Sequence, residues 1–456
     1  MRTDNLKAHS VVWALALLVV FAVGFGGGGS KYGLANLTVQ VAALIGLAFH
    51  REEFFRFWKT APRALSALVA LSIAIPVLQL IPLPPGIWTQ LPGRDIVLQS
   101  FELLGQSGET DHWTSLSVDP VRTTVALTAI ITPLAMLTIG WSAPRDKLVT
   151  IGWIIVGLGL ANLLIGIPQV LSNSETGVLY PENPMPGVLF GTFANRNSTG
   201  LFLVGALALA ALLPAPARAI NYAPLLRGSI CALLLLAIVL TRSRTALVLA
   251  MIPFGVAGLR IVLSHLKGNA FSGTKRSLFA LAPVLLVVTL LGAVLIASPG
   301  RVGMVMDRFE NSSGDARVYI WEDASYASSR YWPVGAGMGT FDEVFQIDES
   351  LENMSMRRAG RAHNDYLEVA IEAGLPGLAL IVGWLALLAW LSWKARRSPD
   401  RWLAWSGASI LLVIALQSIT DYPLRNHTML ALGSFALLML ARFGGAERER
   451  ETGEVA

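Results

Sequence analysis

Apolar residues gather into long blocks along this sequence, separated by short polar or charged segments. Most blocks have roughly the 18 to 22 residues that an α-helix needs to cross a ~30 Å hydrocarbon core. We expect the first block to be a retained helix, because it lacks a small-x-small cleavage site and continues into a second block. The pattern predicts about twelve membrane-spanning helices, at residues 11–27, 33–50, 64–81, 122–141, 148–170, 197–214, 228–241, 244–264, 277–298, 366–393, 402–420 and 427–443.

The composition agrees with a membrane protein of the all-α class. Of its 456 residues, 54% are hydrophobic and 14% are charged, well below the ~25% charge typical of soluble domains. The single cysteine, Cys231, sits in an apolar block, which excludes a disulfide framework and a thiolate metal cluster. The whole chain, 1–456, is therefore expected to form one membrane domain.

The charged loops give this domain an orientation. Every second loop is rich in lysine and arginine, and both termini lie on the same side as these loops. Because short cytoplasmic loops carry the excess of positive charge, that side is expected to be the cytoplasm. The segment 444–456 is then a cytoplasmic tail, and three loops face outward: 82–121, 171–196 and a large loop, 299–365, between the ninth and tenth helices.

The basic residues expected on the outer side are almost all arginine, with Lys31 as the one lysine. A guanidinium group is a planar, permanently charged fork that matches phosphate and carboxylate geometry. For any one of these arginines, a pair with a nearby acid is the favoured explanation, but as a set they indicate anion binding. The set comprises Arg94, Arg122, Arg196, Arg242, Arg244, Arg301, Arg308, Arg317, Arg330, Arg357, Arg358, Arg361 and Arg425.

Two pairs of residues stand out in this set. Arg242 and Arg244, in Thr-Arg-Ser-Arg-Thr at 241–245, sit between two apolar spans, where a charge without a partner is costly. They are the strongest candidates for binding an anion at the membrane surface. Arg317 and Trp321 are four residues apart, hence on one face of a helix, where a cation–π contact within the loop is the alternative.

The segment 190–200 lies where an outer loop enters the sixth span. Arg196 stands at the mouth of that helix, and Asn197 or Ser198 is expected to be its N-cap. The free N–H groups and the dipole of a helix N-terminus suit an anion, although an ordinary cap explains Asn197 equally well.

A glycine-rich run and a histidine cluster follow in the large outer loop. The glycines of 335–339 allow tight turns and close approach of the backbone to a ligand, which is weak evidence by itself. His363 stands with Asn364, Asp365 and Glu368 in a dense polar cluster at the mouth of the tenth span. An imidazole beside a carboxylate can act as a general base near neutral pH, whereas a lone histidine is more often structural. With arginines expected nearby, we favour a catalytic or substrate-binding role.

Several signatures are missing from the sequence. It holds no Asp-x-Asp, the usual metal-binding pair of enzymes that use nucleotide-sugars, and no Gly-x-x-x-x-Gly-Lys-Ser/Thr phosphate loop. We find no acidic or basic residue in the middle of a predicted span, although ion-coupled transporters usually need such buried charges. The sequence therefore disfavours a pump, and no metal or cofactor is expected.

In combination and order, these motifs resemble the O-antigen ligase and polymerase superfamily of bacterial envelope glycan transferases. The resemblance covers the whole topology and implies a GT-C-like, all-α membrane fold. Locally it depends on residues 191–197, 243–245, 317 with 321, 335–341 and 363–377, of which the last block is the most specific.

The resemblance implies an inner-membrane glycosyltransferase that takes a glycan from undecaprenyl pyrophosphate at the periplasmic face, with inversion and without a metal or cofactor. Its partners would be this donor, a glycan or glycolipid acceptor and the lipid bilayer, with no nucleic acid. The expected site residues are His363 as the general base, Arg242, Arg244, Arg196 and Arg317 as pyrophosphate ligands, and Asn195, Asn197, Asn364, Glu368 and Trp321 as substrate-binding residues.

Three functions remain open at this point. A ligase transfers the glycan to lipid A–core or a similar acceptor, and a polymerase transfers it to another repeat unit of O-antigen, capsule or exopolysaccharide. The large outer loop and the cluster around His363 favour a ligase by a small margin. A glycolipid flippase or transporter is the third possibility, disfavoured because the charges sit at the outer mouth and not at mid-membrane depth.

Overall fold

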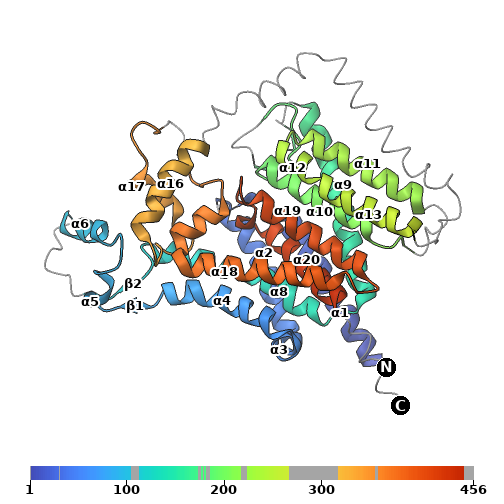
Figure 1. The fold of residues 1–456 in the computed structure, drawn as a ribbon, viewed down its shortest axis with the longest axis horizontal. Coiled ribbons are helices and arrows are strands. Elements are labelled where there is room, and N and C mark those ends of the chain that lie inside the picture. Colours follow the sequence, from blue (N-terminus) through green and yellow to red (C-terminus); the bar gives the residue numbers. More distant parts are fainter. Residues whose placement is uncertain are drawn as a thin grey trace.

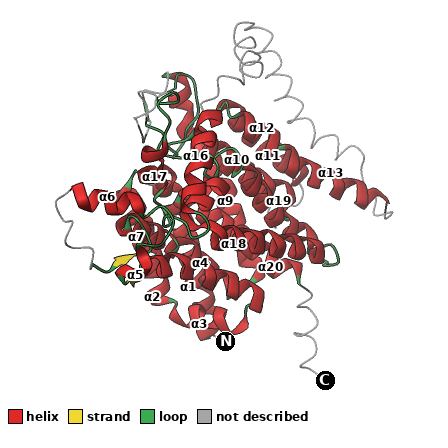
Figure 2. Ribbon diagram, turned by 60° about the vertical axis from the view of Figure 1, so that its left-hand side comes forward, coloured by secondary structure: helices red, strands yellow, loops and turns green. Residues whose placement is uncertain are grey.

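The computed structural model of this chain describes residues 2–29, 31–103, 112–172, 176–177, 179–180, 185–216, 223–266, 317–354 and 358–445. Over these ranges the chain is helical apart from loops and one pair of two-residue strands, β1 (Pro82–Leu83) and β2 (Thr114–Ser115). Figure 2 shows the strands as a short antiparallel pair beside α5 (Pro85–Trp88). The predicted all-α membrane class is confirmed.

Within the described residues, seven helices or helix pairs are long and apolar enough to cross a membrane. They are α1 (Arg2–Phe25) with the short η1 (Gly26–Gly28), α7 (Pro120–Ala129) with α8 (Ile131–Trp141), α9 (Arg145–Leu171), α11 (Ala223–Leu240), α12 (Arg244–Leu249) with α13 (Met251–Leu266), α18 (Asp365–Ala395) and α20 (His427–Gly444).

The remaining apolar helices are bent or shorter. The helices α2 (Gly33–Phe49) and α3 (Arg51–Thr60) meet at an angle of 80°. The helices α4 (Arg63–Gln79), α10 (Arg196–Leu212) and α19 (Arg401–Gln417) are apolar but have at most 17 residues. Every predicted span coincides with one of these helices except 277–298, which lies outside the described residues. The total of twelve crossings stays a prediction.

The core of the membrane part surrounds α10. All residues of this helix from Ser198 to Leu212 are buried, so it has no face toward lipid, as expected for a helix that is apolar all round. α20 packs against α8, α10 and α19, and α1 packs against α20. This central position places the first residues of α10 among several other helix ends.

The loops that are predicted to face outward form a small lobe, which contains α5, α6 (Asp95–Leu103), α16 (Arg317–Tyr331) and α17 (Phe341–Asp348). Figure 1 shows these helices at the end of the molecule away from the start of α1. The core between α16 and α17 includes Tyr331, Phe341 and Phe345. Two parts of the predicted loop 299–365, residues 299–316 and 355–357, lie outside the described residues.

The lobe is joined to the membrane part where α18 breaks. Gly374 has a φ of 54°, so the helix is interrupted after its third turn. The carbonyl oxygens of Ile371 and Glu372 accept hydrogen bonds of 2.8 Å from the amides of Ala336 and Gly337. A β-carbon at Gly335 would lie 2.7 Å from the α-carbon of Ala373. The glycine-rich run therefore packs closely against the backbone of α18. Its amides donate hydrogen bonds to carbonyl groups that lose their partners within the helix where α18 is interrupted.

Candidate active site

His363 and Asp421 form the centre of the candidate site. His363 precedes α18, and Asp421 lies in the short loop between α19 and α20. The Nδ1 atom of His363 is 3.4 Å from Oδ1 of Asp421. This distance is longer than an ideal hydrogen bond, as is common for catalytic groups before substrate binds. One third of the His363 side chain is exposed, whereas Asp421 is buried.

Hydrogen bonds through two further side chains connect Asp421 to the motif at 241–245. Nδ2 of Asn197 donates to Oδ2 of Asp421 at 2.8 Å, and Oγ of Ser243 donates to Oδ1 of Asn197 at 2.9 Å. We call His363, Asp421, Asn197 and Ser243 the polar chain. It connects the N-terminal ends of α10, α12 and α18, which the sequence analysis singled out as three separate candidate segments.

The backbone on both sides of His363 is firmly held. His363 itself has a φ of 51°, a left-handed conformation that is uncommon for residues other than glycine. The amide of Ala362 donates to Oε1 of Glu368 at 2.9 Å, and the carbonyl of Ala362 accepts from the indole of Trp321 at 2.8 Å. Asn364 caps α18 by accepting from the amide of Leu367. These contacts fix the direction of the imidazole.

A buried cluster of ion pairs further stabilises the backbone around His363. Nη2 of Arg425 lies 2.9 Å from Glu372 and 3.1 Å from Glu368, and its Nε is 3.5 Å from Asp365. Arg361 makes a second ion pair with Glu368 at 3.1 Å. Burial opposes charge on Arg425, but the three carboxylates outweigh it and raise its pKa above the ordinary value. The cluster ties the first turns of α18 to the loop before α20.

Asn195, and not Asn197 or Ser198, is the N-cap of α10. Its side chain accepts a hydrogen bond of 2.8 Å from the amide of Asn197. Asn195 also hydrogen bonds to the Tyr422 side chain, whose ring packs against His363 with centroids 5.0 Å apart. Burial and the carboxylate of Asp421 raise the pKa of Tyr422 to about 12. Because Asn195 serves as the cap, the side chain of Asn197 is available for Asp421.

The loop that carries Asn195 is anchored by polar side chains of α9. Oδ1 of Asn162 accepts from the amide of Thr192 at 2.8 Å, and Oε1 of Gln169 accepts from the amide of Gly191 at 2.8 Å. On the other side, the amide of Ala194 donates to Gly27 of η1, where a side chain would collide with the carbonyl of Thr192. The four-glycine segment after α1 is thus needed for close backbone packing beneath the site.

Three of the nominated arginines are adjacent in the sequence to members of the polar chain. Arg242 and Arg244 flank the buried Ser243 and are themselves exposed, and the guanidinium group of Arg242 lies against Gly187. Arg196 is half-buried at the first position of α10, next to Asn195. Arg317 lies one turn before Trp321 on α16, and so shares a face with the side chain that supports Ala362.

The local environment keeps Asp421 ionised. Burial would raise its pKa, but the hydrogen bond and charge interaction with His363, together with the amide of Asn197, lower the pKa below its ordinary value of 3.8. A carboxylate facing Nδ1 favours the imidazole tautomer with the proton on Nδ1. The second ring nitrogen, Nε2, then carries the lone pair.

The sequence did not indicate every member of this arrangement. Asp421 was not nominated, and Arg425 was named only as one of the outer arginines. Both lie in Asp-Tyr-Pro-Leu-Arg-Asn at 421–426, a short charged loop between two apolar spans, and that position is the sequence signal that indicates them.

Glu368 is fully buried, and its carboxylate holds the backbone next to His363. In the part of the chain that the structure describes, no group of three or more His, Cys, Asp or Glu could hold a metal ion.

Comparisons with known proteins give one family match. Residues 229–382 match a protein family described as "O-Antigen ligase". No curated protein matches the chain. A chain from a solved structure described as "Structural coordination of polymerization and crosslinking by a peptidoglycan synthase complex" is 19% identical, and the match covers 83% of this chain and 98% of that one, with a TM-score of 0.37. A similarity at that score carries no argument. The matched family range includes Arg242, Arg244, Arg317 and His363.

Proposed function

We propose that this membrane protein is a glycosyltransferase that takes its glycan from undecaprenyl pyrophosphate, because residues 229–382 match a family described as "O-Antigen ligase". The observation that supports this proposal best is the polar chain, which presents His363 between helix mouths that carry Arg196, Arg242 and Arg244. We further propose that the protein spans the bacterial inner membrane with both termini in the cytoplasm and this site at the periplasmic face.

In the proposed reaction, His363 is the general base. Asp421 accepts a hydrogen bond from the Nδ1–H group, which stays protonated, so the lone pair of Nε2 can take the proton of the acceptor hydroxyl. The hydroxyl oxygen attacks the anomeric carbon as the bond from that carbon to the pyrophosphate oxygen breaks. A single displacement of this kind inverts the anomeric configuration. The proton leaves His363 afterwards to the departing pyrophosphate or to water.

The arginines are proposed to bind the donor and stabilise its leaving group. Negative charge grows on the pyrophosphate in the transition state, and cations fixed beforehand are effective there. Arg242 and Arg244 are exposed and stand on the same short segment, so both can contact the pyrophosphate. Arg196 and Arg317 are assigned to the same anion from neighbouring helix ends.

The remaining nominated residues are given positioning roles. Trp321, Asn364 and Glu368 hold the backbone around His363, as their contacts with Ala362 and Leu367 indicate. Asn195 and Asn197 position Tyr422 and Asp421 around the imidazole. These five residues therefore affect the reaction by positioning His363 and the side chains around it. The sugar is proposed to bind at the solvent-exposed side of His363.

For the acceptor, we propose lipid A–core or a similar glycolipid, because the matched family is described as a ligase. The test is a deletion strain complemented with the wild type or with His363→Ala at equal protein levels, with envelope glycans separated on a gel. Wild type should restore a ladder on lipid A–core, and the variant should accumulate polymer on the lipid carrier. Single unpolymerised repeats in the deletion strain would indicate a polymerase, and unchanged glycans would contradict the enzyme proposal.

A further inference from the structure

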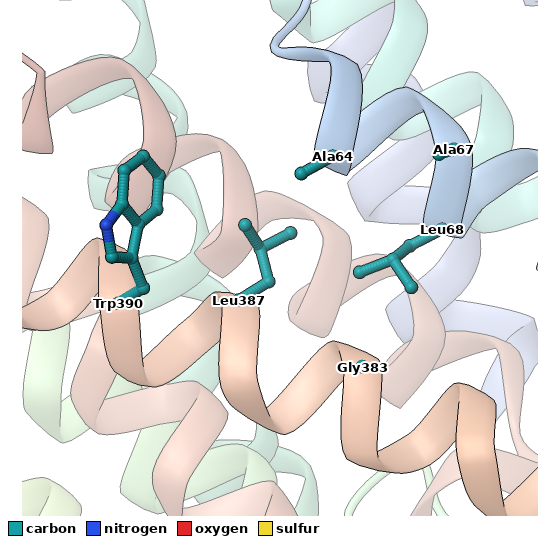
Figure 3. Close-up of a pocket in the computed structure, with 6 residues that line it drawn as sticks. All are labelled: Ala64, Ala67, Leu68, Gly383, Leu387 and Trp390. Atoms are coloured by element: carbon teal, nitrogen blue, oxygen red, sulfur yellow. The ribbon is translucent and has the colours of Figure 1, made fainter.

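An apolar groove lies between α4 and α18, far from the candidate active site. Its volume is about 470 Å³, and it is lined by Ala64, Ala67 and Leu68 of α4 and by Gly383, Leu387 and Trp390 of α18. Figure 3 shows these side chains on the two facing helices. From Gly374 to Trp390 the helix extends roughly 24 Å at ~1.5 Å per residue, so the groove is at the other end of α18 from His363.

The groove exists because the two helices touch at one level and separate at the next. A β-carbon at Gly383 would lie 2.9 Å from Cδ2 of Leu68, and the indole of Trp384 donates to Oγ of Ser72 at 3.1 Å. Beyond this contact, the small side chains of Ala64 and Ala67 leave the space open. The lining is entirely apolar, and its volume falls within the range of ~300–1,000 Å³ that is usual for small-molecule sites.

A cation lies next to the lining residues of the groove on each of its two helices. Arg63 is the first residue of α4 and precedes Ala64 in the lining. Lys394, in the last turn of α18, lies 5.1 Å from the ring centroid of Trp390, which is itself part of the lining. Both side chains are exposed. Nearby, the guanidinium group of Arg396 lies 3.9 Å from the ring of Trp393, an arrangement typical of the level of lipid headgroups.

We propose that this groove binds one anionic phospholipid of the leaflet on the basic side of the membrane. An acyl chain would occupy the space between Ala67 and Leu387, and the phosphate group would lie between Arg63 and Lys394. Charge complementarity decides the class of lipid, since an apolar groove alone would accept any acyl chain, whereas cations on both walls favour an anionic headgroup. The site is separate from the glycan chemistry proposed above and does not depend on it.

The test uses the purified full chain in detergent and native mass spectrometry. The probes are phosphatidylglycerol and phosphatidylcholine with identical acyl chains. Two cations at the headgroup should make binding of phosphatidylglycerol tighter by roughly 10- to 30-fold. The double variant Arg63→Gln with Lys394→Gln should reduce this preference to less than about 3-fold. Ala67→Phe, at an exposed position that lines the groove, should weaken binding of both lipids.

A matched control removes the same charge from elsewhere on the basic side. Lys147→Gln with Arg401→Gln changes α9 and α19, outside the groove, and should leave the preference at its wild-type value. Equal binding of the two lipids by the wild type would overturn the proposal, as would an unchanged preference in the Arg63 and Lys394 double variant. A change of oligomeric mass in Ala67→Phe would identify a second copy of the chain as the occupant and would also overturn it.

Discussion

Nδ1 of His363 lies 3.4 Å from Oδ1 of Asp421, and the other oxygen of the same carboxylate is held at 2.8 Å by Asn197. The carboxylate is thus fixed at one oxygen and presents the other to the imidazole. This arrangement is the usual means of fixing the tautomer of a catalytic histidine. In the proposed mechanism, it makes the partly exposed His363 a directed base.

Asp421→Asn tests this relationship directly. The amide has the shape of the carboxylate but no charge, and its NH2 group can face Nδ1, which favours the wrong tautomer. We expect kcat for glycan transfer to fall by about 10²- to 10⁴-fold, with a small change in KM. The control is Asp400→Asn, which removes a carboxylate paired with Arg145 at 3.4 Å, elsewhere in the chain. Equal kcat values for wild type and Asp421→Asn would rule out this role of Asp421.

The depressed pKa of Asp421 gives a prediction for stability against pH. The folded pKa is below the ordinary value of 3.8, so ionised Asp421 stabilises the fold at neutral pH. That contribution is fully present above pH 3.8 and is lost as the pH falls through the lower folded pKa. Thermal unfolding in detergent between pH 6 and pH 2 should therefore show a steeper acid loss for wild type than for Asp421→Asn. Parallel curves would contradict the assigned environment.

Much of the fold is predictable from the sequence because a membrane span needs a long apolar block. α9 ends at Leu171 and α10 begins at Arg196, as the apolar blocks predict, whereas the outward position of the segment 171–196 stays a prediction. The break in α18 was not predicted, since the predicted span 366–393 runs through Gly374 without an interruption. Gly374 and Pro376 are the sequence signal for that break.

The site was predictable only in part. His363, Asn197 and Arg242 could be nominated because each is a polar residue at the end of an apolar span. Asp421 could not be paired with them from the sequence, since its partner Asn197 is 224 positions away and only the packing of α10, α19 and α20 brings them together. The N-cap was assigned two or three residues too late, because Asn195 and Asn197 both have side chains suited to that role.

The buried cluster around Arg425 should dominate the stability of the outer side. Arg425→Met would leave the carboxylates of Glu368 and Glu372 without this partner, which typically costs about 3–5 kcal/mol. We expect a large fall in the thermal midpoint or a failure to accumulate in the membrane. The matched control is Arg358→Ala, whose ion pair with Asp342 is exposed and should contribute at most about 1 kcal/mol. Similar thermal midpoints for the two variants would contradict the large contribution to stability that we assign to the Arg425 cluster.

The break in α18 should be equally sensitive to a single methyl group. Gly374 has a φ of 54°, and a β-carbon there would collide with the carbonyl oxygen of Pro333. Gly374→Ala should therefore lower both the thermal midpoint and the transfer activity, because the lobe and His363 share this support. Gly258→Ala places the same methyl group in open space on α13 and should leave both quantities near wild type. An active, stable Gly374→Ala variant would show that the break can relax.

The most direct test of the proposed function separates donor binding from chemistry in the purified protein. Transfer of a glycan from undecaprenyl pyrophosphate and binding of that donor are measured for wild type, His363→Ala and the double variant Arg242→Ala with Arg244→Ala. The account predicts that His363→Ala binds the donor as wild type does but transfers at least about 10²-fold more slowly, as expected when a general base is lost. The double arginine variant should lose donor affinity as well as rate. Wild-type transfer by His363→Ala would contradict the central assignment.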